Sequence, residues 1–250
     1  MIQEPEPAAT DRRWRGLYAT AGVAALLTAG AVPLQVLLLI VAPPPDGRSV
    51  VEWFSAFGSS PVYGLLSLDL VMMVEQVLGL AIAAALFIVL RHNAESTMAL
   101  AFVAWIVAIG LLLSANTGFQ MLSLSDAYAD ATSEAQRASL VAAGQAMLAT
   151  YWSMGTAFVF GYLLSATAGI LIGAAMLRSG AFGRAAGWIG IAGNGIGLAV
   201  FVPVVGIALS LVSVLILVIW WAIVGARLLG LARAMSVSRR PLAEPRPAAA

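Results

Sequence analysis

The sequence predicts an all-α fold, a polytopic membrane protein with six transmembrane helices and a short extracytoplasmic amphipathic helix between the third and the fourth. Of its 250 residues, 61% are hydrophobic and 10% are charged. A soluble domain is about 45–50% apolar and about 25% charged. Apolar residues in this excess cannot all be buried in one soluble core. Long apolar segments and an uneven distribution of arginine complete the prediction.

Six segments hold the roughly 20 mostly apolar residues that a helix needs to cross a bilayer. They are residues 17–41, 62–90, 98–120, 152–177, 185–202 and 206–227. The last two form a helical hairpin, because Pro203 ends a helix and Gly206 permits a tight reversal. The first segment follows three arginines, as a signal peptide does, but its apolar run continues to Ile40, so we expect it to be retained.

The six segments make one membrane domain at residues 17–229. The flanking tails, 1–16 and 230–250, are rich in Pro, Ala and charged residues, and we expect them to be disordered because they have little to bury.

Arginine is distributed unequally between the two sides of the predicted bundle. One side would hold eleven arginines and the other two, Arg48 and Arg137. The eleven are Arg12, Arg13, Arg15, Arg91, Arg178, Arg184, Arg227, Arg233, Arg239, Arg240 and Arg246. Because basic residues accumulate in cytoplasmic connections, both termini are expected in the cytoplasm.

The two longer connections on the other side hold structure of their own. Residues 52–57 place three aromatic side chains beside Glu52, as in a segment at the membrane interface. Residues 132–148 form an amphipathic pattern that Thr132 or Ser133 can cap, with Glu134 in the first turn. This helix would lie on the bilayer or over the mouth of the bundle.

Missing residue types exclude several chemistries. The chain has no Cys and its basic residues are all Arg, which excludes thiolate metal sites, Schiff bases on lysine and P-loops. A single histidine, His92, cannot build a multi-histidine zinc site. Asp126 and Asp130 lack the ligand spacing of a calcium site. We therefore expect no metal and no cofactor, and the net charge of +1 argues against nucleic acid as a partner.

The stretch SANTGFQMLSLSDAYADATSEAQRASL at residues 114–140, continuing to Tyr151, resembles a bacterial six-span family labelled domain of unknown function 4386. RSGAFGR at 178–184 and FVPVVG at 201–206 are similar to it as well. The resemblance covers residues 17–229. It implies six helices in the bacterial cytoplasmic (inner) membrane, but no reaction and no catalytic residue.

Polar residues interrupt the second segment at Asp69, Glu75 and Gln76. A carboxylate at the bilayer centre costs about 2.5–3.5 kcal/mol on insertion scales, so it normally faces protein or water. On one continuous helix, Asp69 and Gln76 would lie about 20° apart and Glu75 about 120° from Asp69. Without water, desolvation favours the neutral form of Glu75.

Depth along the segments groups the polar residues into two layers. Glu75, Gln76, Ser165 and Asn194 fall near the middle of their segments. Asp69 is roughly 9 Å closer to the outside at 1.5 Å per residue, at the depth of Asn116 and Gln120. Arg48 or Arg137 could fold in to pair with Asp69. Together these residues predict an intramembrane polar pocket; the alternative is structural polar groups hydrogen-bonded between helices.

Three functions are compatible with this pattern. The first is a small-solute or proton-linked binding or transport protein that uses Glu75 and Asp69. The second is an interaction or regulatory subunit whose glycine-rich helix faces bind another membrane protein or a second copy. An integral membrane enzyme is the least expected of the three. A cavity that reaches Glu75 would favour the first function, and a dry, packed Glu75 the second.

Overall fold

The structure is a computed structural model, and it describes residues 12–45, 49–152 and 155–237. Every regular element within these ranges is helical. The elements are η1 (Arg12–Trp14), α1 (Arg15–Val41), α2 (Val50–Ser59), α3 (Pro61–Ser67), α4 (Leu70–Leu90), α5 (Glu95–Ala115), α6 (Gly118–Ala129), α7 (Glu134–Trp152), α8 (Thr156–Arg178), α9 (Arg184–Gly197), η2 (Leu198–Phe201) and α10 (Gly206–Val237).

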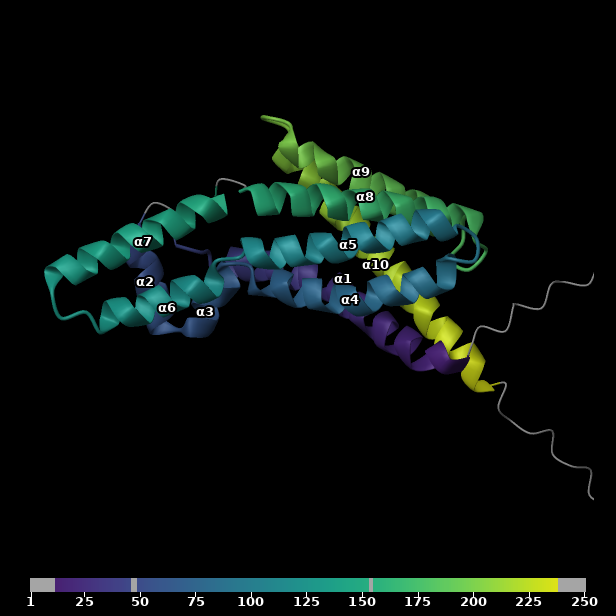
Figure 1. Ribbon diagram of the computed structural model, residues 1–250, viewed down its shortest axis with the longest axis horizontal. Helices are drawn as coiled ribbons and strands as arrows, with labels where there is room; N and C mark the ends of the chain where they lie inside the picture. Colours follow the sequence, from purple (N-terminus) through teal and green to yellow (C-terminus); the bar gives the residue numbers. More distant parts are fainter. Residues whose placement is uncertain (1–11, 46–48, 153–154, 238–250) are drawn as a thin grey trace, which may run out of the picture.

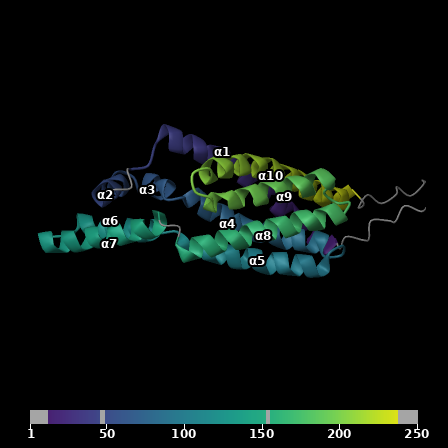
Figure 2. The same ribbon diagram turned by 90° about the horizontal axis from the view of Figure 1, so that it is seen from above.

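Six helices form a closed ring. Along the chain α1, α4, α5, α8, α9 and α10 each pack against the next, and α10 returns to pack against α1. Figure 2 shows α1, α9 and α10 on one side of the ring and α5 and α8 on the other. Large apolar side chains such as Leu27, Leu37, Leu100 and Leu215 are exposed on its outside, which is the surface that a lipid environment requires.

Within the described ranges, five helical stretches are long and apolar enough to cross a membrane. They are Arg15–Leu38, Leu70–Leu90, Glu95–Ala129, Thr156–Arg178 and Ala208–Ser236. The predicted segment 185–202 corresponds to α9, which has 14 residues, followed by the short η2. It is helical and belongs to the ring, but it is not one of the five.

Two predicted segments are divided in the structure. Segment 62–90 is interrupted after α3, where Asp69 takes the left-handed conformation at φ 59°. Segment 98–120 is interrupted between α5 and α6, where Asn116 is extended. Conversely, the predicted segment 206–227 continues as α10 to Val237, so residues 230–237 are helical rather than part of a disordered tail. Leu228 and Ala232, four residues apart, are buried against the bundle and extend the packed face. In the N-terminal tail, residues 12–16 are helical as well, because they belong to η1 and to the start of α1. Residues 1–11 and 238–250 lie outside the described residues.

Small residues bring the helices of the ring into close contact. A Cβ on Gly173 of α8 would lie 2.8 Å from the carbonyl oxygen of Gly187 on α9. A Cβ on Gly225 of α10 would lie 2.9 Å from the carbonyl oxygen of Gly22 on α1. The helices of the fourth and fifth predicted segments therefore pack closely, through small residues that let their backbones approach.

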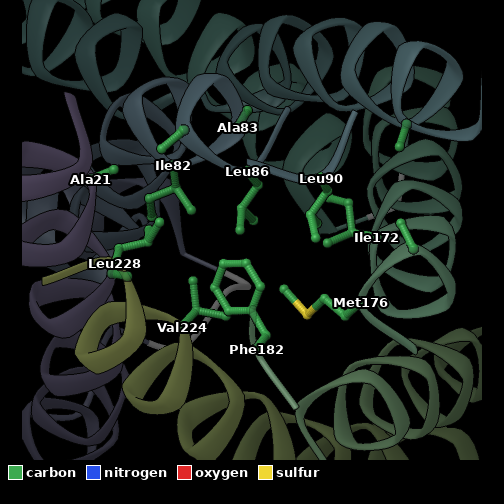
Figure 3. Close-up of a cluster of buried hydrophobic side chains, with 14 of the residues drawn as sticks. Ala21, Ile82, Ala83, Leu86, Leu90, Ile172, Met176, Phe182, Val224 and Leu228 are labelled. Carbon is green, nitrogen blue, oxygen red and sulfur yellow. The ribbon is translucent and has the colours of Figure 1, made fainter. Parts of the chain in front are cut away.

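An apolar cluster closes one end of the ring. Figure 3 shows Phe182, from the connection between α8 and α9, among Leu86, Met176, Val224 and Leu228. Phe182 is only 2% exposed. In Figure 1 this end, at the right, holds the start of α1, the α4–α5 turn, the α8–α9 connection and the end of α10.

A helical cap formed by α2, α3, α6 and α7 extends beyond the opposite end of the ring (Figure 1, left). It has its own apolar core, which includes Trp53, Phe54 and Phe57. The aromatic side chains of residues 52–57 are therefore buried in the cap rather than placed at an interface with lipid. In α7, the predicted amphipathic helix, the Gln136 backbone N–H donates to Ser133 Oγ at 3.2 Å, so Ser133 is the cap.

Candidate functional site

A cavity of about 160 Å³ lies inside the ring. Each of the six ring helices contributes to its lining: Thr28 from α1, Glu75 and Gln76 from α4, Trp105 from α5, Ser165 from α8, Asn194 from α9, and Trp220 and Trp221 from α10. Gly169 leaves room for the Asn194 amide in this lining, because a Cβ on Gly169 would collide with it. The cavity is therefore a product of the whole ring rather than of one helix pair.

Three polar atoms of this lining are buried without a hydrogen-bond partner among the described residues. They are Glu75 Oε1, Thr28 Oγ1 and Trp220 Nε1. The Thr28 and Trp220 side chains are 6% and 1% exposed. Burying such a group unsatisfied costs about 1–3 kcal/mol. All three belong to residues that line the cavity, so its wall contains polar groups whose hydrogen bonding is not satisfied within the described residues.

A smaller cavity of about 80 Å³ adjoins the first and shares Ser165, Asn194 and Leu217 with it. Its other polar groups are bonded to backbone. Tyr162 Oη donates to the Gly197 carbonyl at 3.2 Å, and Ser213 Oγ donates to the Gly193 carbonyl at 2.7 Å. The Asn194 amide likewise donates to the Gly190 carbonyl of its own helix at 2.8 Å. These bonds hold the polar side chains between α8, α9 and α10.

A third cavity, of about 330 Å³, lies between the ring and the cap, where α4 and α8 begin and α5 ends. Asp69, Asn116 and Thr117 line it. Asp69 Oδ1 accepts a hydrogen bond from Gln35 Nε2 at 2.8 Å. Asn116 joins both helix interruptions, because its Nδ2 donates to the Leu68 carbonyl at 2.7 Å and its Oδ1 accepts from the Gly118 backbone N–H at 2.8 Å.

The structure thus divides the candidate site residues between two cavities. Glu75, Gln76, Ser165 and Asn194 line the cavity inside the ring, and Asp69 and Asn116 line the one beneath the cap. The expectation that Asp69 and Gln76 share one helix face is wrong, because α4 begins at Leu70 and Asp69 is left-handed.

Three other candidates lie elsewhere. Gln120 is exposed on α6 and is not part of the lining of the cavities described above. Arg137 Nη2 donates to the Ala131 carbonyl in the α6–α7 connection at 3.2 Å. Arg48 lies outside the described residues, and its expected pairing with Asp69 stays a prediction.

Sequence reasoning missed Thr28 and the three tryptophans. Thr28 carried a usable signal, since it is a polar residue in the middle of an apolar segment. Tryptophan in such a segment carries none, because it is equally typical of lipid-facing and packed positions. Within the part of the chain that is described, no three His, Cys, Asp or Glu residues gather into a metal-binding group.

The chain matches no protein-family model, no curated protein and no solved structure. The resemblance of residues 114–151 to a six-span family therefore stays a prediction.

Proposed function

We propose that this chain is a six-span protein of the bacterial cytoplasmic membrane that binds or transports a small solute, or a solute together with protons, in the cavity inside its helix ring. The five long apolar stretches supply five spans. α9 with η2 supplies the sixth, since it packs between α8 and α10 as a full member of the ring. Both termini and the arginine-rich connections belong on the cytoplasmic side, and α7 on the other.

The observation that carries the proposal is that three residues lining one cavity hold buried polar atoms with no hydrogen-bond partner among the described residues. These atoms are Glu75 Oε1, Thr28 Oγ1 and Trp220 Nε1. Structural polar groups between helices normally have hydrogen-bond partners, as Asn116 and Ser213 do here, which donate to the Leu68 and Gly193 carbonyls. A cavity of this size with polar walls has room for water or a small molecule. The unpartnered atoms are therefore better explained by a solute-binding site than by a structural role.

The end of the ring that holds the apolar cluster around Phe182 is the arginine-rich end, since Arg91 follows α4, Arg178 ends α8 and Arg184 begins α9. The cluster supports a state in which the cavity is closed at this end. On α4, Ile82 lines the cavity, and Leu86 and Leu90 follow at successive turns toward that end, both buried in the cluster. On the cap side, Met72 of α4 lines the cavity beneath the cap, and it is three residues before Glu75, roughly 4.5 Å at 1.5 Å per residue. We infer that a solute reaches Glu75 from the cap side in this conformation.

The alternative of an interaction subunit has less support. It requires glycine-rich faces to be available on the outside of the bundle. Gly173 and Gly187 instead contact each other's helices, and a Cβ on Gly190 or Gly193 would meet Trp220 or Leu217 of α10. These glycines are used for contacts within the chain.

Thiol accessibility tests the proposal, because the chain contains no cysteine of its own. Ser165→Cys places a thiol on the cavity wall with little change in size. It should react with methyl methanethiosulfonate, a small neutral reagent, in membrane vesicles. Thr167→Cys is the matched control: it lies two residues away on α8 but is exposed on the outside of the ring, where lipid should keep its thiol protonated and unreactive. Equal, negligible labelling at both positions would show a dry interior and overturn the proposal.

A further inference from the structure

We propose that the ligand of the cavity inside the ring is a small organic cation of the alkylammonium class. It would be held by the Glu75 carboxylate and by the indole rings of Trp105, Trp220 and Trp221. This inference rests on the proposed function, since it names the ligand class of the same cavity.

Three indole rings form a continuous aromatic wall of the cavity. The ring centroids of Trp105 and Trp221 are 5.7 Å apart with a 31° interplanar angle. Those of Trp220 and Trp221 are 4.6 Å apart with a 47° angle. All three residues line the cavity that Glu75 lines. Tryptophan is the aromatic residue that attracts cations most strongly, by about 2 kcal/mol or more when the contact is desolvated.

The charge of the cavity favours a cation over an anion or a neutral molecule. Glu75 is the one acid in its described lining, and none of the described lining residues is basic. A carboxylate at membrane depth is costly without an opposite charge, so a bound cation would supply the partner that the chain does not. An anion would be repelled by the negative faces of the indole rings, and it could not pair with Glu75 in either protonation state.

The remaining polar atoms set the shape of the cation. Trp220 Nε1 can only donate a hydrogen bond, and Thr28 Oγ1 can donate or accept. Trp220 Nε1 lies against Gly190 of α9, where an added Cβ would approach it to 2.7 Å, so Thr28 is the group that a hydroxyl on the ligand would satisfy. A cavity of about 150 Å³ accommodates a molecule of the size of benzene, which corresponds to about six heavy atoms. Choline, a trimethylammonium group with a short hydroxylated arm, is therefore a suitable probe.

Isothermal titration calorimetry of the purified full chain in lipid nanodiscs tests the inference. Choline should bind, and 3,3-dimethylbutan-1-ol, which has the same shape without the charge, should bind at least about tenfold more weakly. Glu75→Gln should weaken choline binding by about tenfold or more, and Trp221→Leu should weaken it as well. Glu52→Gln, the same change at an exposed acid of the cap, should leave binding unchanged.

A second measurement covers a Glu75 variant that does not fold. Choline should slow the labelling of Ser165→Cys by methyl methanethiosulfonate, and 3,3-dimethylbutan-1-ol should not. Labelling of Ser165→Cys without any effect of choline would overturn the cation inference and leave the proposed function standing. Equal affinity for choline and its neutral analogue would also overturn it. Failure of Ser165→Cys to react at all would overturn both.

Discussion

The Asn116 side chain connects the interruption between α3 and α4 with the interruption between α5 and α6. Interrupted helices leave backbone groups without their helical partners, and inside a membrane each costs several kcal/mol unless it is satisfied. The Asn116 side chain bonds the Leu68 carbonyl, where α3 ends, and the Gly118 backbone N–H, where α6 begins. At 3% exposed, it leaves little room for water to replace either bond. One side chain thus stabilises both interruptions.

Asn116→Ala should destabilise the protein by about 1–3 kcal/mol, because it leaves two backbone groups unpaired. Unfolding in mixed detergent with increasing denaturant measures the difference in free energy. Ser114→Ala is the control, since Ser114 is exposed and bonds only the Leu111 carbonyl of its own helix; it should change stability by less than about 0.5 kcal/mol. Equal effects of the two variants would show that Asn116 does not hold the interruptions together.

Counting residues from the ends of the segments places Glu75, Ser165 and Asn194 at one depth, and the structure brings these three to one cavity. The same count could not find the break at Asp69. The contacts around its left-handed backbone come from residues distant in sequence. Gln35 donates a hydrogen bond to the Asp69 side chain, and Asn116 donates one to the carbonyl of the preceding residue, Leu68. Local sequence carries no record of such contacts.

Among the elements, the connection between α8 and α9 has a role beyond joining two helices. It places Phe182 in the centre of the apolar cluster (Figure 3). The following residue, Gly183, has φ 81°, a conformation that glycine adopts at no steric cost. The turn therefore fixes the position of Phe182 against Met176 and Val224.

Phe182→Ala should open the arginine-rich end of the ring. In inside-out vesicles carrying Ser165→Cys, the added Phe182→Ala change should increase the rate at which an impermeant thiosulfonate labels the cysteine. Phe119→Ala is the control, because Phe119 is exposed on α6. Size-exclusion chromatography checks folding, since removal of a buried phenylalanine costs about 3–5 kcal/mol. An unchanged labelling rate would show that Phe182 only packs and does not close the cavity.

The existence of the helices is predictable from apolar length, but their bounds are less so. Segments 62–90 and 98–120 are apolar across the interruptions at Asp69 and Asn116, and hydrophobicity alone cannot distinguish a continuous span from a span followed by a cap helix. The aromatic residues of α2 were expected at the interface for the same reason. Their burial against α6 and α7 depends on the cap as a whole.

At the scale of the whole molecule, the ring and the cap have separate apolar cores. The ring core is densest at the arginine-rich end, and the polar cavity lies nearer its middle. The cap covers the opposite end (Figure 1). The arginine-rich connections lie at the end opposite the cap, and the orientation inferred from the arginine distribution stays a prediction.

Single cysteines test that orientation. Ser236→Cys, near the end of α10, should resist an impermeant thiol reagent in intact cells, and Ser133→Cys, at the start of α7, should react. Ser133 is exposed and Ser236 is partly exposed, so neither side chain is buried within the protein. Labelling at Ser236 with none at Ser133 would reverse the proposed orientation.

The most direct test of the central claim, that Glu75 faces a cavity that small molecules reach, is the infrared carboxyl band of Glu75. The difference between the parent and Glu75→Gln should contain one protonated carboxyl band, because the described lining of the cavity holds no basic residue to pair with a carboxylate when no cation is bound. In D₂O this band should shift to lower frequency within the time of mixing, because water in the cavity exchanges the proton. A band that stays unshifted for hours would show a dry, packed Glu75 and contradict the proposed binding cavity.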